Sequence, residues 1–153
     1  MFGGRSISTD KVMTGQNIVE LTRAATRFRQ MIENADRAKL PIEFENFPTG
    51  SCGSASRLLA QYLIDGGLDA PNYVVGDIVE PTKSRSHAWL ELDGVVIDIT
   101  ADGFDPDMPK VVVTKGSSWH HQFRIRDEHL PAINLYEDRP IPRLAAAYQE
   151  LTG

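Results

Sequence analysis

The stretch from Ser86 to Ala101, SHAWLELDGVVIDITA, most constrains how this chain can fold. Two runs of alternating residues flank Asp93-Gly94, and that pattern is the strongest short-range signal for a β-hairpin with a two-residue turn. Such a turn places Leu92 opposite Val95, and we expect the pairing to continue until His87 faces Thr100. Because successive side chains of a strand point to opposite faces, each face of this hairpin has its own composition.

The two faces of the predicted hairpin differ sharply. One is apolar and carries Ala88, Leu90, Leu92, Val95, Ile97 and Ile99; the other carries His87, Trp89, Glu91, Val96, Asp98 and Thr100. His87 and Asp98 are diagonal neighbours on the second face, at a backbone separation of about 7–8 Å that such side chains can close. A histidine and an acid aimed at a common space are the base and its orienting group in a nucleophilic site. A solvated outer face is the alternative interpretation.

Size and composition suit a single domain, which we expect over residues 1–153 with residues 1–12 as a loose start. The chain has 153 residues, 41% of them apolar, so it can bury a core without crosslinks. Its net charge of −5 argues against nucleic acid or an anionic membrane surface as the main partner. No apolar run approaches the roughly 18 residues of a membrane span.

Cys52 is the single cysteine of the chain. It excludes an intrachain disulfide and a cysteine-rich zinc site, and it fits a reducing compartment. The N-terminal sequence MFGGRSISTD lacks the apolar segment of a signal peptide. We therefore expect a cytoplasmic location, or secretion without a cleaved signal peptide, and no cofactor or metal.

Two helices are predicted before the hairpin. The first begins near Thr14 and ends near Asn34, because apolar residues recur there at helical spacing. These residues are Ile18, Leu21, Ala25, Phe28 and Ile32. After a loop over residues 41–50, a second helix starts close to Ser51 and stops at Gly66-Gly67.

Further strands are predicted at residues 73–79, 111–113 and 123–126, a loop at residues 102–109, and a short helix at residues 143–151. An order of helices, then strands, then a helix is typical of an α+β domain. We expect an antiparallel sheet packed against the helix that carries Cys52.

Cys52 follows Thr49-Gly50-Ser51, where a loop enters the second predicted helix. Amides in the first turn of a helix have no helical partner, and the helix dipole favours a negative charge there. Both effects stabilise a thiolate and lower the pKa of the thiol. The same amides could hold the oxyanion of a tetrahedral intermediate. The alternative is a buried, inert cysteine that only packs.

A cysteine at a helix start, followed by a histidine and an acid on a hairpin, resembles the papain-like and transglutaminase-like cysteine hydrolase superfamily. The order Cys52, His87, Asp98 is closer to the transglutaminase-like branch. The string Gly50-Ser51-Cys52 is similar to part of the papain signature, although Thr49 and Gly53 stand where papain relatives have a cysteine and an aromatic residue. The resemblance spans residues 45–104, about two fifths of the chain.

The resemblance implies that amide, isopeptide or thioester bonds are cleaved or formed through a covalent acyl-enzyme. It assigns Cys52 as nucleophile, His87 as its proton partner and Asp98 as the orienting acid. It also implies that Asn46, six positions before the nucleophile, donates a hydrogen bond to the oxyanion, with loop shaping as the alternative. The expected partner is a protein or peptide substrate. Hydrolysis, transfer, deamidation and crosslinking share the acyl-enzyme, so the choice stays open, as does the oligomeric state.

Two other functions remain open. A non-enzymatic interaction domain on the same fold would bury Cys52 with an ordinary thiol. A zinc hydrolase would need a metal site, which His120 or His121 could complete with His87, Asp98 and Cys52. Being adjacent, the two histidines are expected to point to opposite faces of a strand.

Overall fold

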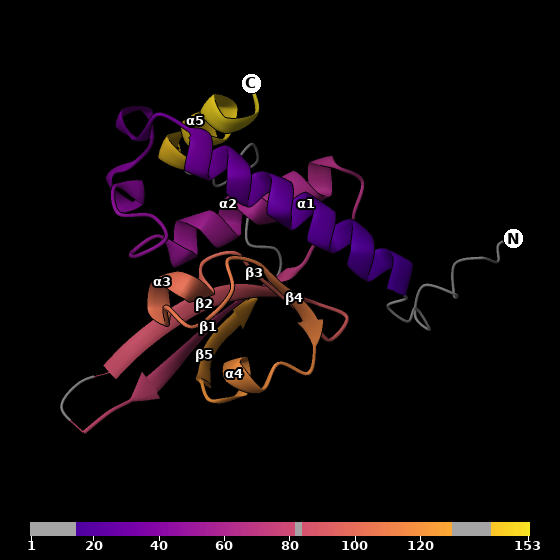
Figure 1. Cartoon of the computed structure of the whole chain (residues 1–153), viewed down its shortest axis with the longest axis vertical. Helices are drawn as coiled ribbons and strands as arrows, with labels where there is room; N and C mark the ends of the chain where they lie inside the picture. Colours follow the sequence, from indigo (N-terminus) through magenta and orange to yellow (C-terminus); the bar gives the residue numbers. More distant parts are fainter. Residues whose placement is uncertain (1–14, 82–83, 130–141) are drawn as a thin grey trace, which may run out of the picture.

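The computed structural model describes residues 15–81, 84–129 and 142–153, and the expected loose start at residues 1–12 lies outside them. A layer of helices covers one face of an antiparallel sheet (Figure 1). The larger helices are α1 (Gly15–Asn34), α2 (Cys52–Asp65) and α5 (Pro142–Thr152). The strands are β1 (Asn72–Val79), β2 (Ser84–Leu92), β3 (Val95–Asp98), β4 (Val112–Lys115) and β5 (Arg124–His129). The predicted α+β class is confirmed.

The sheet has the order β4-β3-β2-β1-β5, and every neighbouring pair is antiparallel. The predicted hairpin forms its centre, with Leu92 opposite Val95 and Leu90 opposite Ile97. Asp93 and Gly94 have φ values of 50° and 81°, the left-handed pair that a two-residue hairpin turn requires.

The predicted pairing does not extend to His87 and Thr100. The ladder between β2 and β3 ends at Leu90 and Ile97, and β3 itself ends at Asp98. Thr100 is instead the N-cap of α3 (Ala101–Phe104), a short helix where a loop over residues 102–109 was predicted. The chain therefore leaves the sheet just after Asp98, and the neighbouring half of β2 has no strand on that side.

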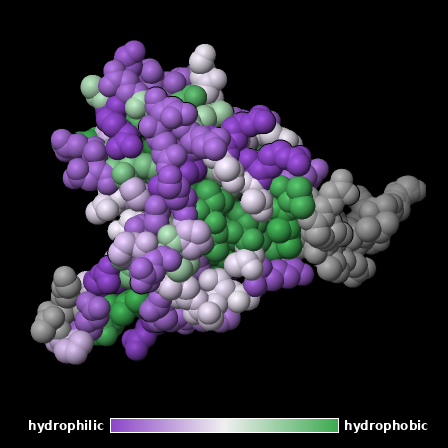
Figure 2. All heavy atoms as spheres, in the orientation of Figure 1, coloured by the Kyte–Doolittle hydropathy of each residue, from purple (hydrophilic) through white to green (hydrophobic). Residues whose placement is uncertain are grey.

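The main core lies between the helices and the apolar face of the hairpin. On α1, Leu21, Ala25, Phe28 and Ile32 are fully buried and Ile18 packs against them, as the helical spacing predicts. The side chains of α2 fill the centre against Leu90 and Ile97. Polar residues dominate the outer surface of the helices, and hydrophobic ones show mainly where α1 meets β4 (Figure 2).

The second face of the sheet is not a solvated surface, so that alternative is wrong. A smaller apolar cluster covers it, made of Val74, Trp89, Val96, Ala101, Val112 and Phe123. The chain from α3 to Phe123 closes over this face and includes α4 (Ser118–His121). His120 and His121 thus lie on a short helix, so the expectation for adjacent residues of a strand does not apply to them.

Short helical turns also occupy part of the connection between α1 and α2. The turns η2 (Arg37–Lys39) and η3 (Ile42–Phe44) precede the loop that leads to Cys52. Phe44 and Phe47 are buried, so this stretch is an anchored segment rather than an open loop. None of the helices in the described part of the chain is long and apolar enough to cross a membrane.

Arg29 is a buried charge that ties α1 to the segment after β3. Its side chain is only 5% exposed, and it binds both carboxylate oxygens of Asp102 at 2.7 and 3.0 Å. It also donates to the carbonyl of Ile99 at 2.9 Å, and its guanidinium stacks 4.8 Å from the centre of the Phe47 ring. Arg29 therefore contacts both the segment that follows Asp98 and the segment that precedes Cys52.

Replacing Phe28 by alanine tests whether α1 contributes to the core. Because Phe28 is 0% exposed, we expect Phe28→Ala to lower the free energy of unfolding by about 3–5 kcal/mol. Val19 on the same helix is 51% exposed, and Val19→Ala should change the free energy of unfolding by less than about 0.5 kcal/mol. Denaturant titration measures both; a cost below about 1 kcal/mol for Phe28→Ala would place that face outside the core.

Candidate active site

Cys52 lies in the first turn of α2, as predicted, and it is half-buried. Ser51 occupies the N-cap position but makes no side-chain capping bond. Its hydroxyl donates instead to the carbonyl of Pro48, at 3.1 Å. The amides of the first turn of α2 are therefore not used by the N-cap side chain.

The loop before Cys52 rests directly on α3. A Cβ atom at Gly103 would lie 2.5 Å from the carbonyl oxygen of Pro48, so this close approach of two main chains requires glycine. Thr49 Oγ1 also donates to the carbonyl of Gly103 at 3.5 Å. Because α3 follows Asp98 after two residues, this contact fixes the loop before Cys52 relative to Asp98.

His87 and Asp98 meet on the second face of the sheet, as their diagonal placement predicts. The distance from His87 Nε2 to Asp98 Oδ2 is 2.7 Å. Both residues are buried, with exposed fractions of 2% and 1%. The other carboxylate oxygen of Asp98 accepts hydrogen bonds from the amide of Thr100 at 2.9 Å and from its hydroxyl at 3.4 Å.

The Cys52 sulfur reaches the other side of the same imidazole. The His87 ring and the main-chain amide of Ala88 lie close enough to lower the pKa of the thiol. Since Asp98 occupies Nε2, the ring nitrogen that remains for the thiol is Nδ1. Ser56 Oγ donates to the carbonyl of Ala88 at 3.4 Å, so α2 lies against β2 where β3 has left the sheet.

The electrostatics favour an ion pair between thiolate and imidazolium. Burial lowers the pKa of His87, but the charge of Asp98 and hydrogen bonds to Asp98 and Cys52 outweigh it and raise that pKa to about 9. Burial raises the pKa of Cys52, yet the His87 ring and the Ala88 amide bring it below its ordinary value. Burial likewise raises the pKa of Asp98, but the charge of His87 and the bonds from both imidazoles hold it well below its usual range.

His120 also contacts the acid, which sequence reasoning missed. Its Nε2 lies 2.7 Å from Asp98 Oδ2, and its Nδ1 lies 2.6 Å from Ser117 Oγ. The sequence marked His120 only as a possible metal ligand. Adjacent histidines after a tryptophan carry no local signal for a helical turn folded over the sheet, so the position of His120 could not be derived.

A metal ion could use the ligating atoms of His87, Asp98 and His120, which lie within 4.8 Å of one another. Their side chains are 0–2% exposed, and hydrogen bonds within the described part of the chain already engage each of those atoms. A catalytic zinc site keeps a coordination position open to water or substrate. Because all three atoms are buried and already hydrogen-bonded, they fit a hydrogen-bond network better than a catalytic zinc site. Cys52 is not in this cluster.

Aromatic rings enclose the His87–Asp98 pair. Trp89 stacks on His87 with 5.9 Å between ring centres, and Phe104, Trp119 and Phe123 contact the same imidazole at 5.5–5.8 Å. Trp89 Nε1 donates to Glu91 at 3.0 Å, so Glu91 is a partner rather than a purely solvated acid. Excluding water strengthens the electrostatic coupling of the pair.

Asn46 is not tied to this group of residues. It is exposed in the turn after η3, and its carbonyl accepts a hydrogen bond from the amide of Thr49 at 2.8 Å. Within the described ranges, no hydrogen bond joins its side chain to the Cys52 site. Its role as an oxyanion donor therefore stays a prediction.

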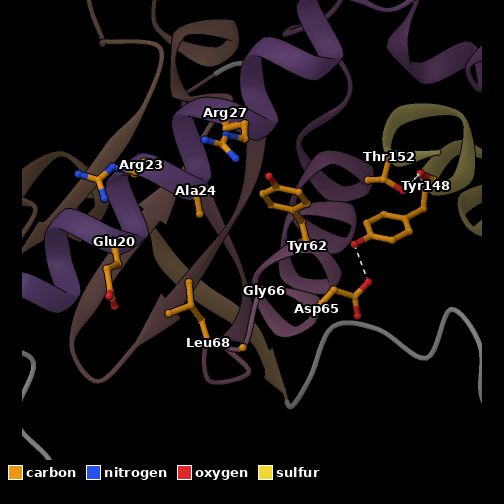
Figure 3. Close-up of a pocket in the computed structure, with 11 residues that line it drawn as sticks. Glu20, Arg23, Ala24, Arg27, Tyr62, Asp65, Gly66, Leu68, Tyr148 and Thr152 are labelled. Carbon is orange, nitrogen blue, oxygen red and sulfur yellow. Dashed lines mark hydrogen bonds between the residues drawn. The ribbon is translucent and has the colours of Figure 1, made fainter.

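A separate cavity of about 680 Å³ lies between α1, the end of α2 and α5 (Figure 3). Arg27, Tyr62 and Tyr148 line it, and Tyr148 donates to Asp65 Oδ2 at 2.6 Å. Asp65 ends the helix that Cys52 begins, which puts the cavity about 20 Å from the thiol at 1.5 Å per residue. The cavity is thus distinct from the site built on Cys52.

Comparisons with protein-family models, with curated proteins and with solved structures find no match to this chain.

The pH dependence of thiol alkylation tests the ion pair. Because hydrogen bonding to His87 lowers the pKa of Cys52, iodoacetamide should label Cys52 with a midpoint below the ordinary thiol value of about 8.5. His87→Ala should move that midpoint upward. His121, the exposed neighbour of His120, supplies the control. His121→Ala should leave the labelling midpoint unchanged. A midpoint at or above about 8.5 in the unchanged protein would refute the ion pair.

Proposed function

We propose that this protein is a cysteine hydrolase or acyltransferase of the transglutaminase-like kind, acting on peptide or isopeptide amide bonds through a thioester intermediate. The observation that carries the proposal is the chain of contacts from the Cys52 thiol to the His87 ring and on to the Asp98 carboxylate, 2.7 Å from that ring. The three residues come from the start of α2, the middle of β2 and the end of β3.

In the first half of the reaction, the Cys52 thiolate attacks the carbonyl carbon of the amide. The oxyanion that forms is stabilised by amides in the first turn of α2, with Asn46 as a further donor to be tested. The imidazolium of His87 then gives its Nδ1 proton to the leaving nitrogen, the C–N bond breaks, and an amine departs. The acyl group remains on sulfur as a thioester.

In the second half, His87 is neutral and acts as the base. It removes a proton from water, or from an acceptor amine, which attacks the thioester carbonyl. The C–S bond breaks, the acyl product leaves, and the thiolate–imidazolium pair is restored. Water gives hydrolysis and an amine gives transfer or crosslinking. The expected partner is a protein or peptide, and we propose a cytoplasmic location or secretion without a cleaved signal.

An interaction domain on the same fold is the main alternative. It would need no buried acid behind His87, and placing a carboxylate at 1% exposure is expensive unless it is paired. The lowered pKa of Cys52 favours a reactive thiol over an inert one. Intact mass after exposure to a library of electrophilic amides and aldehydes, read at Cys52, would identify a substrate for the kinetic tests.

Three substitutions should separate nucleophilicity from orientation. Cys52→Ala should abolish thioester formation, and His87→Ala should be nearly as damaging, because it removes both the thiolate partner and the proton donor. Asp98→Asn should cost less than the roughly 10⁴-fold loss known for a serine triad, because the thiolate charge exists before attack.

Turnover by the unchanged protein should fall above pH about 9, where His87 loses its proton.

Steady-state kinetics of the three variants, with circular dichroism to verify folding, measure these effects. If Asp98→Asn were as severe as His87→Ala with folding unchanged, Asp98 would take part in the chemistry directly. If Asp98→Asn had no effect on turnover, Asp98 would not be the orienting acid.

Metal analysis of the purified protein tests the zinc-hydrolase alternative. That alternative predicts a stoichiometric ion and loss of turnover on chelation.

A further inference from the structure

The Asp98 carboxylate serves two imidazoles through one oxygen atom. His87 Nε2 and His120 Nε2 each lie 2.7 Å from Asp98 Oδ2. All three side chains are 0–2% exposed, so water does not compete for these bonds. The reaction proposed above uses His87 and Asp98, and it leaves a second, equally close histidine without a role.

Ser117 fixes the ring of His120 from its other side. Ser117 Oγ accepts a hydrogen bond from the amide of His120 at 3.2 Å, as the N-cap of α4, and lies 2.6 Å from His120 Nδ1. Because the Asp98 carboxylate can only accept, His120 Nε2 is the donor to it, and the Ser117 hydroxyl donates its hydrogen to Nδ1. That assignment leaves the ring hydrogen on Nε2, aimed at Asp98.

We propose that His120, held by Ser117, is a positioning residue that fixes the Asp98 carboxylate against His87 and so maintains the reactive form of Cys52. This inference rests on the proposed function, since it assigns His120 a role in the same site. Each oxygen of Asp98 then has its own set of donors: Thr100 binds Oδ1, and the two histidines share Oδ2. A buried carboxylate with every acceptor position satisfied keeps both its charge and its orientation.

The loss of His120 should act on Cys52 through two intermediaries. Without this donor the buried carboxylate is less well satisfied and less firmly oriented, so its hold on the His87 proton weakens. A weaker imidazolium stabilises the thiolate less, and the pKa of Cys52 should rise. A residue with only a packing role would change stability without moving that pKa.

The experiment measures iodoacetamide labelling of Cys52 against pH in the full chain. His120→Phe keeps a ring and removes both ring nitrogens; His120→Gln keeps an amide donor; Ser117→Ala removes the anchor alone. We expect His120→Phe to raise the midpoint by about one pH unit, a lower-end value for the loss of one favourable partner. His120→Gln and Ser117→Ala should give smaller rises, and His121→Phe, at the exposed neighbouring position, should give none.

Turnover provides a second readout on the substrate found in the electrophile screen. His120→Phe should lower kcat and leave KM unchanged, because His120 does not touch the substrate. A midpoint and kcat equal to those of the unchanged protein in folded His120→Phe would overturn the inference while leaving the Cys52–His87 pair intact. An ordinary midpoint in the unchanged protein would instead refute the proposed function itself.

Two further outcomes would also overturn the positioning role. Ser117, His120 and Asp98 repeat the order of hydroxyl, imidazole and acid found in serine hydrolases, so labelling of Ser117 by a fluorophosphonate would make His120 a base. Stoichiometric zinc lost on His120→Phe would make it a metal ligand. If His120→Phe does not fold, Ser117→Ala alone decides the question, because removing one hydroxyl leaves the core side chains in place.

Discussion

The rest of this site depends on the hydrogen bonds that stabilise the buried negative charge of Asp98. A carboxylate that is 1% exposed is tolerated only because it accepts hydrogen bonds from two histidines and from Thr100. The same charge raises the pKa of His87 to about 9, and His87 in turn lowers the pKa of Cys52. The Asp98 charge itself raises the pKa of Cys52, so the lowering comes through the His87 imidazolium that Asp98 stabilises.

The fold supplies this arrangement by ending one strand early. Strand β3 stops at Asp98, so the second half of β2 is open on one side, and α2 approaches it there. The thiol can then contact His87, although α2 packs on the face of the sheet opposite that histidine. Arg29 stabilises the segment where the chain leaves the sheet after β3, because it binds the carbonyl of Ile99 and both carboxylate oxygens of Asp102.

Sequence reasoning succeeded where the signal is local. The turn at Asp93-Gly94 set the register of the hairpin, and helical spacing with Gly66-Gly67 set the bounds of α2, so Cys52, His87 and Asp98 could be placed in advance. It failed for His120 and Arg29, whose partners lie 22 and 73 residues away. Arg29 falls on the buried face of α1, but helical spacing does not identify its distant partner, and His120 follows no periodic pattern. The second apolar cluster was missed for the same reason, because the chain after Asp98 has no regular period that predicts its return over the sheet.

The contact between Gly103 and Pro48 joins two loops that are far apart in the chain, one on each side of the site. In an unfolded chain Cys52 has neither His87 nor a buried acid beside it, and its pKa is that of an ordinary thiol. The environment that lowers the pKa of Cys52 therefore depends on a tertiary contact between the chain after β3 and the chain before α2. The lowered pKa of Cys52 is thus a property of the folded molecule alone, and a measurement of that pKa reports whether this part of the chain has folded.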